Sequence, residues 1–472
     1  YVPMYAMYHG SYGHTLETPS RAEDGVDAHY AAVWGALNFV VENREAMIHD
    51  QIEIYRRGFL DLPQMLIPDE LLDETQYEQY NELTVQEFPA AYVIPAGQPF
   101  QQSSHQAARL VDFMLFNDVQ VEKASQSFSL DGVNYPKGTY IVWMDQPKRG
   151  LANMILDAGP DLSDIEGLTF YSPPSVWSHP LLWGANRAVM EEKLDIKTNT
   201  VNNADAPKGS AEGGKAKAYA YLPTSLAAIK ATNDLLARGV DLHRVPEPFD
   251  GFGAGAIIVP DDPALANELA NDYALDVFTL KNEPTAAVPM AEQRIAVYGD
   301  EGVIHALKTL GFDYDEVSTS DLNAGVISGY DVFHNYGLRW TSLNDDGRAY
   351  FTDWFAAGGD YVGLAYRGRA IDFAVDAGIA DVDYGYISGN AILNIDYDPD
   401  DTVAAGYAED GYAFVYRSAW FTDWTDMQVS ASIDSGDFLV SGFWEDWQTS
   451  GANGMPVIVQ DTDCLLYTSP SP

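Results

Sequence analysis

The sequence predicts a multidomain α/β protein, in which strands alternate with helices along most of the chain. Its 472 residues correspond to roughly three domains of about 150 residues each. Hydrophobic residues make up 46% and aromatic residues 12%, so the chain can form several packed cores. Short apolar segments alternate with amphipathic segments of helical length, an order that is typical of parallel sheets covered by helices on both faces.

The chain is strongly acidic, with 70 Asp and Glu against 26 Lys and Arg and a formal net charge of −44. This balance excludes nucleic-acid binding through a basic face, because such binding needs clustered Lys and Arg. Most of the acidic residues are aspartates. That composition suits either a protein kept hydrated in high salt or an ordinary acidic secreted protein. No apolar run approaches the ~20 residues that a membrane-spanning helix requires, so we expect no membrane span.

The two ends of the chain differ from the rest. Tyr1 is not an initiator Met and no signal segment follows it, so we expect the natural protein to begin upstream. Residues 464–472 resemble the translation of a common sequencing adapter, and a genuine Ser/Pro-rich tail is the alternative. Without that tail the sequence has no cysteine, which excludes disulfides, cysteine-ligated metals and a cysteine nucleophile.

Residues 1–58 contain a predicted strand at 11–19, which ends at Pro19. Asp27 can then cap a long helix whose apolar positions recur every three or four residues. These positions are Tyr30, Val33, Trp34, Leu37, Val40, Val41, Ile48, Ile52 and Tyr55. They form one stripe, so we expect the helix to pack against a sheet or another helix. Residues 59–88 are predicted to form a helical connector.

Residues 89–195 and 218–290 are predicted to be two diverged copies of one α/β unit. Expected elements of the first are strands at 92–95, 119–121 and 138–143 and a helix at 103–117; those of the second are strands at 219–223, 240–245 and 255–260. Both copies contain Gly-x-x-Ile-Val followed by Leu-Ala-Asn. The segment 196–217, rich in Gly, Ala, Lys and Asn, is expected to be a linker between them.

Residues 291–463 are predicted to form a third α/β unit. Its expected strands lie at 294–298, 330–333 and 361–365, and its expected helices at 301–310 and 346–357. This alternation predicts right-handed crossovers and a parallel sheet. Residues 380–463 are more β-like and very acidic, which favours an antiparallel addition or a set of long surface hairpins.

The segment that most strongly suggests chemistry is Gly13-His14-Thr15-Leu16-Glu17-Thr18-Pro19, just before the long helix. It resembles the end of the catalytic domain of M14-type zinc carboxypeptidases, in which a strand carries a catalytic glutamate and a final amphipathic helix closes the fold. Glu17 occupies the matching position. The resemblance implies that Glu17 is a general base toward a zinc-bound water and then a proton donor to the leaving amine. The alternative is a solvated glutamate beside a turn.

The resemblance implies a zinc cofactor whose ligands, a His-x-x-Glu pair and a second His, would lie upstream of residue 1. We therefore expect no metal site in this fragment and no activity from it alone. His9 and His14 are five residues apart, which places them on opposite faces of an extended segment and disfavours them as a ligand pair. His14, Tyr12 and His9 are instead expected to line the substrate pocket or to orient Glu17 by contacts that do not involve the substrate.

The third unit resembles class I glutamine amidotransferase-like domains. In that family a strand that ends in a Gly-rich turn presents a cysteine at the start of a helix. The matching turn is 364–370, and Tyr366 occupies the nucleophile position. A tyrosine cannot carry out the thioester chemistry, so we expect this unit to be structural or to bind a ligand.

Two further patterns are weaker. Residues 396–401 have the carboxylate spacing of a calcium loop but lack its Gly and final Glu, so a solvated acidic turn is the simpler interpretation. Four tryptophans could form a sugar-binding platform, although such residues more often pack in a core. They are Trp420, Trp424, Trp444 and Trp447.

These features predict a partial carboxypeptidase-like domain followed by α/β units with mainly parallel sheets, the last flavodoxin- or amidotransferase-like with an acidic β-rich addition. The predicted function is that of a fragment of a secreted, extracellular zinc metallocarboxypeptidase that hydrolyses C-terminal bonds of peptide or protein substrates. The alternative is a non-catalytic α/β module that binds peptides or glycans.

Overall fold

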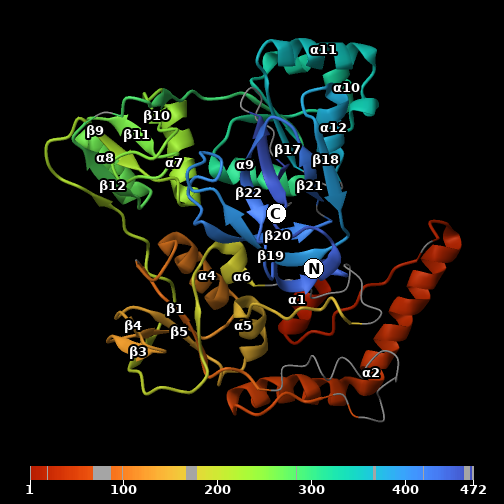
Figure 1. The fold of residues 1–472 in the computed structure, drawn as a ribbon. Helices are drawn as coiled ribbons and strands as arrows, with labels where there is room; N and C mark the ends of the chain where they lie inside the picture. The colour runs from red at the N-terminus through yellow and green to blue at the C-terminus, as the bar shows by residue number, and fades with distance from the viewer. Residues whose placement is uncertain are drawn as a thin grey trace. The chain divides into compact units, whose positions relative to one another are not determined.

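A computed structural model describes residues 2–18, 20–66, 68, 87–97, 99–165, 178–282, 284–364, 368–417, 419–461 and 468–469. The protein is a multidomain α/β protein, and its chain divides into two compact units (Figure 1). Unit 1 comprises Tyr1–Asp157 and Trp177–Asp205, and unit 2 comprises Ala158–Val176 and Ala206–Pro472. Among the described helices, none combines the length and apolar character needed to cross a membrane.

Unit 1 is built on a five-stranded sheet in which every neighbouring pair of strands is antiparallel. The strands, in spatial order, are β6 (Ala188–Met190), β1 (Ala91–Ile94), β5 (Tyr140–Trp143), β2 (Glu122–Ala124) and β7 (Thr198–Thr200). All four residues of β1 are buried, and they alternate between two cores. Tyr92 and Ile94 face the helices, whereas Ala91 and Val93 face the opposite side.

Both long helices of the sheet layer cover the same face. They are α4 (Ser104–Phe116) and α5 (Arg149–Leu156). Helix α4 begins where the Ser103 hydroxyl accepts a hydrogen bond from the Gln106 N–H at 3.4 Å. Its buried residues recur at helical spacing and join the same core as those of α5. They are Ala107, Leu110, Val111 and Met114.

The remaining elements of unit 1 are peripheral. They are α1 (Val2–Tyr8), α2 (Glu23–Phe59), the hairpin of β3 (Phe128–Leu130) and β4 (Val133–Tyr135), and α6 (His179–Trp183). The hairpin turns through Asp131 and Gly132, both with positive φ, which is the turn geometry that matches the twist of paired strands. It packs on the face of the sheet opposite to α4.

Unit 2 contains a second sheet with the spatial order β13, β10, β11, β9, β12, β8. Their bounds are β8 (Ser210–Ala211), β9 (Ala218–Tyr221), β10 (His243–Arg244), β11 (Ile257–Pro260), β12 (Asp276–Leu280) and β13 (Val288–Pro289). Only the β12–β8 pair is parallel. Helices α7 (Leu226–Ala237) and α8 (Pro263–Asp272) share one core and therefore cover one face.

The first two sheets have the same connectivity. The order along the chain is strand, helix, strand, strand, helix, strand, both as β1-α4-β2-β5-α5-β6 and as β9-α7-β10-β11-α8-β12. In each, the four strands are arranged fourth, first, third, second, which is the ferredoxin-like βαββαβ arrangement. A diverged internal repeat would produce this shared connectivity.

The expectation of parallel sheets is wrong for these two sheets. The strand-helix-strand crossover does leave its two strands pointing the same way, but the third strand inserts between them and pairs antiparallel with both. The expected linker at 196–217 is also wrong in part, because it contains β7 and β8.

The third sheet is parallel, as predicted. Its spatial order is β15 (Tyr314–Glu316), β14 (Ile295–Tyr298), β16 (Val332–Asn335), β17 (Asp360–Leu364) and β25 (Thr468–Ser469). The last of these strands belongs to the tail that resembles a sequencing adapter. The helices are α9 (Glu301–Leu310), α10 (Thr319–Asn323), α11 (Asp345–Ala356) and α12 (Arg369–Ala377), with short 3₁₀ turns at Val326–Gly329 and Trp340–Ser342.

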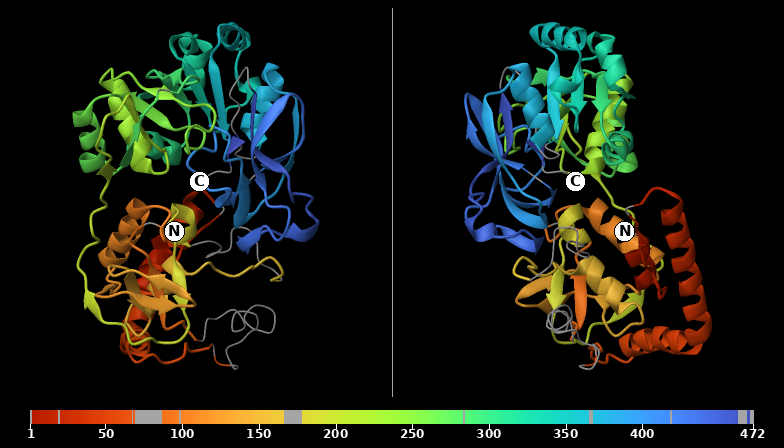
Figure 2. Two further views of the ribbon diagram at one scale, coloured as in Figure 1. Left: turned by 60° about the vertical axis from the view of Figure 1, so that its left-hand side comes forward. Right: turned by 90° about the vertical axis from the view of Figure 1, so that its right-hand side faces the viewer.

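The antiparallel addition predicted for 380–463 is confirmed (blue in Figure 2). Its strands are β18 (Val382–Tyr386), β19 (Asn390–Tyr397), β20 (Asp410–Tyr416), β21 (Ala419–Trp424), β22 (Met427–Ile433), β23 (Leu439–Phe443) and β24 (Pro456–Asp461), with a 3₁₀ turn at Trp447–Thr449. Trp420 and Trp444 lie in its core with ring centroids 5.5 Å apart. Core packing is thus the better interpretation of these tryptophans.

The N-terminal predictions are wrong in two respects. Residues 11–18 form no strand, because no neighbouring strand among the described residues offers the hydrogen-bonded ladder that an extended segment needs. The long helix α2 begins at Glu23 rather than after Asp27. Most of the predicted connector at 59–88 lies outside the described residues; its first part, 60–66, is not helical.

We expect Leu110→Ala to lower the free energy of unfolding of unit 1 by about 2–5 kcal/mol, because Leu110 is fully buried between α4 and the sheet. Phe116→Ala, on the same helix but 80% exposed, is the matched control and should change it by less than about 0.5 kcal/mol. Urea denaturation measures the change in the free energy of unfolding for each substitution. Hydrogen exchange of the β1 and β5 amides shows whether the change lies in unit 1. Equal effects of the two substitutions would contradict this packing.

A second prediction concerns His334 on β16. Burial lowers the pKa of His334 to about 4, and its Nδ1 is buried without a hydrogen-bond partner among the described residues. The His334 imidazole therefore binds a proton more readily in the unfolded chain than in the folded one. The free energy of unfolding has its full value above about pH 6.5 and decreases as the pH falls toward about 4. The loss should reach at most about 3 kcal/mol.

His334→Gln should flatten the stability profile between these pH values, as measured by urea denaturation at a series of pH. The control is His305→Gln, on the exposed side of α9, which should leave the profile as it is. A wild-type profile without any slope between pH 4 and 6.5 would refute the assignment.

Candidate functional site

The sequence-predicted site residues do not form one site in unit 1. Glu17 and His14 are exposed, in the segment 11–18. Tyr12 is also exposed, and its hydroxyl donates a hydrogen bond to the Met47 carbonyl of α2 at 2.9 Å. This hydrogen bond ties the segment to α2 and leaves the Glu17 side chain exposed.

His9 is held by a different set of groups. One ring nitrogen lies 3.1 Å from the Asn117 Oδ1 at the end of α4, and the other lies 3.1 Å from the Lys148 Nζ. The Tyr5 ring packs against it at 4.7 Å between centroids, and the Tyr5 hydroxyl donates to the same Asn117 oxygen at 2.5 Å. His9 therefore anchors the N-terminal segment to α4, which is a structural role.

The described part of the chain contains no group of three or more His, Cys, Asp or Glu side chains that could hold a metal ion. The described residues thus do not fit a zinc ion. The proposed nucleophile position, Tyr366, lies outside the described residues; the strand before it ends at Leu364, and helix α12 begins at Arg369.

The acidic segment 396–401 is stabilised by amide donors rather than open to a cation. Asp401 is 2% exposed, and its Oδ2 accepts hydrogen bonds from Gln428 Nε2 at 3.2 Å and Gln460 Nε2 at 2.7 Å. Its Oδ1 accepts from the Val403 N–H at 2.9 Å. This carboxylate fixes a loop to β22 and β24, which supports the structural interpretation over calcium binding.

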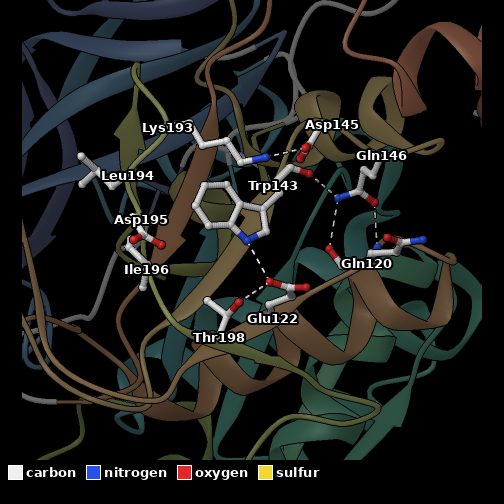
Figure 3. Close-up of a pocket in the computed structure, with 10 residues that line it drawn as sticks. All are labelled: Gln120, Glu122, Trp143, Asp145, Gln146, Lys193, Leu194, Asp195, Ile196 and Thr198. Atoms are coloured by element: carbon white, nitrogen blue, oxygen red, sulfur yellow. Dashed lines mark hydrogen bonds and ion pairs between the residues drawn. The ribbon is translucent and has the colours of Figure 1, made fainter.

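Unit 1 contains a pocket of about 660 Å³ that no sequence motif predicted (Figure 3). Its lining residues come from the start of β2, the end of β5 and the segment that leads into β7. They are Gln120, Glu122, Trp143, Asp145, Gln146, Lys193, Leu194, Asp195, Ile196 and Thr198. This volume lies within the usual range for small-molecule sites.

Trp143 occupies the centre of the lining, between Glu122 and Lys193 (Figure 3). Strands β2 and β5 are neighbours, with Glu122 paired to Ile141, so Glu122 and Trp143 are diagonal neighbours. The Trp143 Nε1–H donates to the Glu122 Oε2 at 2.9 Å, and the Thr198 hydroxyl donates to the same oxygen at 2.6 Å. Two donors from two strands therefore hold this carboxylate in place.

Lys193 lies over the Trp143 indole. Its Nζ is 5.1 Å from the ring centroid and donates to the Asp145 Oδ2 at 2.5 Å. The Lys193 side chain is 58% exposed and that of Asp145 37% exposed. An ion pair so open to water contributes little to stability, so Lys193 can leave this position at small cost.

Gln146 holds the backbone of the pocket together. It is 2% exposed, and its Oε1 accepts from the Gln120 N–H at 2.7 Å. Its Nε2 donates to the Gln120 carbonyl at 3.1 Å and to the Trp143 carbonyl at 2.6 Å. These three hydrogen bonds join the end of β5 to the residues before β2.

The pocket carries an excess of negative charge. Glu122, Asp145 and Asp195 line it together with a single base, Lys193, so the formal charge of its lining is three negative against one positive. Sequence reasoning could place Trp143 at the end of a strand, but no local motif connects it to Lys193 or Asp195, which lie some fifty positions further along the chain.

No protein-family model matches this chain, and no curated protein matches it. Among solved structures, a protein described as a GMP synthase component from Thermoplasma acidophilum is similar over 38% of this chain and 84% of its own length. The sequence identity is 11% and the TM-score is 0.28. A similarity at this level carries no argument about function.

We expect Gln146→Leu to destabilise unit 1 by about 1–3 kcal/mol, because it removes three part-buried hydrogen bonds to the Gln120 and Trp143 backbone. The control is Gln120→Ala, which keeps both backbone hydrogen bonds and should change stability by less than about 0.5 kcal/mol. Urea denaturation and the exchange rate of the Gln120 amide are the measurements. Unchanged exchange in Gln146→Leu would contradict the proposed restraint.

Proposed function

We propose that Glu17 and α2 belong to a zinc metallocarboxypeptidase domain that hydrolyses C-terminal bonds of peptide or protein substrates, and that the zinc ligands lie on residues preceding Tyr1. The proposal includes export of the protein from the cell. Its sequence support is the segment Gly13–Pro19 followed directly by a long amphipathic helix. The described residues do not fit zinc, so the metal site is assigned entirely to the preceding residues.

The observation that carries the proposal is the uncovered apolar stripe of α2. Its residues recur at spacings of three and four, yet Tyr30 is 72% exposed and Trp34 59% exposed. Others on the stripe are exposed to a similar degree: Val33, Leu37, Val40, Val41, Ile48 and Ile52. Apolar stripes of this length in soluble proteins are normally buried. The remainder of a peptidase domain, which that family closes with its last helix, would supply the missing surface.

In this proposal the Glu17 carboxylate accepts a proton from the attacking water and passes it to the leaving amine. Such a role needs a carboxylate that can reach substrate, and Glu17 is exposed on a segment fastened to α2 through Tyr12. The preceding residues would then form the opposite wall of the site.

The test uses the natural full-length polypeptide. Sequencing the DNA upstream of the Tyr1 codon gives the reading frame from which this polypeptide is expressed. We expect Glu17→Gln to reduce release of C-terminal amino acids by about 100-fold or more, since general acid–base groups contribute factors of this size. Zinc content, measured by mass spectrometry, should remain unchanged.

Glu42→Gln is the matched control, because Glu42 is an exposed glutamate on α2. It should retain full activity. Upstream DNA without His-x-x-Glu and a later His, or full activity in Glu17→Gln, would refute the proposal. Loss of zinc in Glu17→Gln would instead make Glu17 a ligand and contradict its role in proton transfer.

A further inference from the structure

We propose that the pocket around Trp143 binds the protonated amine or guanidinium group of a basic ligand, in the position that Lys193 occupies in this structure. The ligand class is a lysine or arginine side chain of a peptide, or a free alkylamine with the same cationic group. The inference rests on unit 1 alone and does not depend on the proposed peptidase function.

Lys193 shows which chemical group the pocket accepts. Its ammonium is placed by two features at once, the face of the Trp143 indole at 5.1 Å and the Asp145 carboxylate at 2.5 Å. An aromatic face combined with a carboxylate is how proteins recognise organic cations. Lys193 is thus an internal occupant that an external cation can replace.

The charge of the lining favours a cation over an anion. Lys193 compensates one of the three carboxylates, which leaves an excess of negative charge next to the indole. Glu122 is held by Trp143 and Thr198 through one oxygen, so its charge stays close to the indole edge. An incoming anion would be repelled by this arrangement, whereas a cation gains from it without displacing any buried group.

The pocket is also preorganised. The Gln146 side chain joins the backbones of Gln120 and Trp143, which both line the cavity, and Trp143 packs on the core shared with β3 and β4. The indole therefore does not have to be ordered when a ligand binds, which preserves affinity. The mobile participant is Lys193, whose side chain is 58% exposed.

Isothermal titration calorimetry on the full chain tests the proposal with four probes. They are Nα-acetyl-lysine amide, Nα-acetyl-arginine amide, putrescine, and neutral Nα-acetyl-norleucine amide. The two charged amides should bind, more weakly as salt is raised, and the norleucine derivative should not. Binding by both amides and putrescine assigns the site to the cationic group itself, whereas binding by the amides alone assigns it to peptide side chains.

Lys193→Ala is the decisive variant, because it removes the internal competitor together with a positive charge. We expect it to tighten binding of the cationic amides by about two- to fivefold, the range of an exposed ion pair. Asp145→Asn should weaken binding by a similar factor. The matched control is Lys230→Ala: Lys230 pairs with Asp234 at 3.0 Å and is 48% exposed, but it belongs to α7 of unit 2 and is not among the lining residues of the pocket.

Lys230→Ala should leave the affinity unchanged. Equal binding of the norleucine derivative, or weaker or unchanged binding in Lys193→Ala, would overturn the proposal. Because Asp145 and Lys193 are both exposed, neither substitution endangers folding. An unchanged affinity in these variants therefore cannot be attributed to misfolding.

Discussion

The two ferredoxin-like sheets bury apolar side chains on both of their faces, and that constraint determines much of the structure around them. The strand β1 is buried at all four residues and sends alternate side chains into two separate cores. In both ferredoxin-like sheets the two long helices cover one face only. Other segments must cover the second face: the β3–β4 hairpin and residues 188–196 in unit 1, and a cluster with Phe249 and Phe252 in unit 2. The Trp143 pocket lies where this second cover ends in unit 1, because Leu194 and Ile196 contribute both to the core and to the pocket wall.

The elements themselves were largely readable from the sequence, because local patterns encode them. Helix α4 has its Ser103 cap and its apolar residues at helical spacing, and the parallel strands of the third sheet alternate with helices. Strand pairing was not readable in the first two sheets, since it depends on β5 and β11 inserting between strands that a crossover leaves parallel. The strand predicted for 11–19 failed for a related reason: extended sequence becomes a strand only beside a partner, and none of the described strands pairs with it.

The pocket illustrates a different limit. Glu122, Trp143 and Lys193 come from three separate segments, and only the register of β2 with β5 and the path of the chain into β7 bring them together. No spacing rule connects them. The composition nevertheless gave one general indication: in a strongly acidic chain, a lysine such as Lys193 is expected to pair with carboxylates. Here it also lies on an indole, and this combination makes the lining selective for a cationic group.

The long helix α2 differs from the two ferredoxin-like sheets, because its apolar residues are not covered. Helices α4 and α7 each bury four residues of one face in a core, whereas the stripe of α2 from Tyr30 to Ile52 is open. The chain carries a net charge of −44, which keeps molecules apart but does nothing to cover an apolar surface. The segment bearing Glu17 is fastened to α2 by Tyr12, which donates to the Met47 carbonyl, and by Gln51, whose amide donates to the Gly10 carbonyl. The segment thus lies on residues of α2 that are partly buried, Met47 and Gln51, whereas their neighbours Ile48 and Ile52 stay open. Tying down a polar loop therefore does not cover the apolar stripe, because burial of such a stripe needs an apolar partner surface.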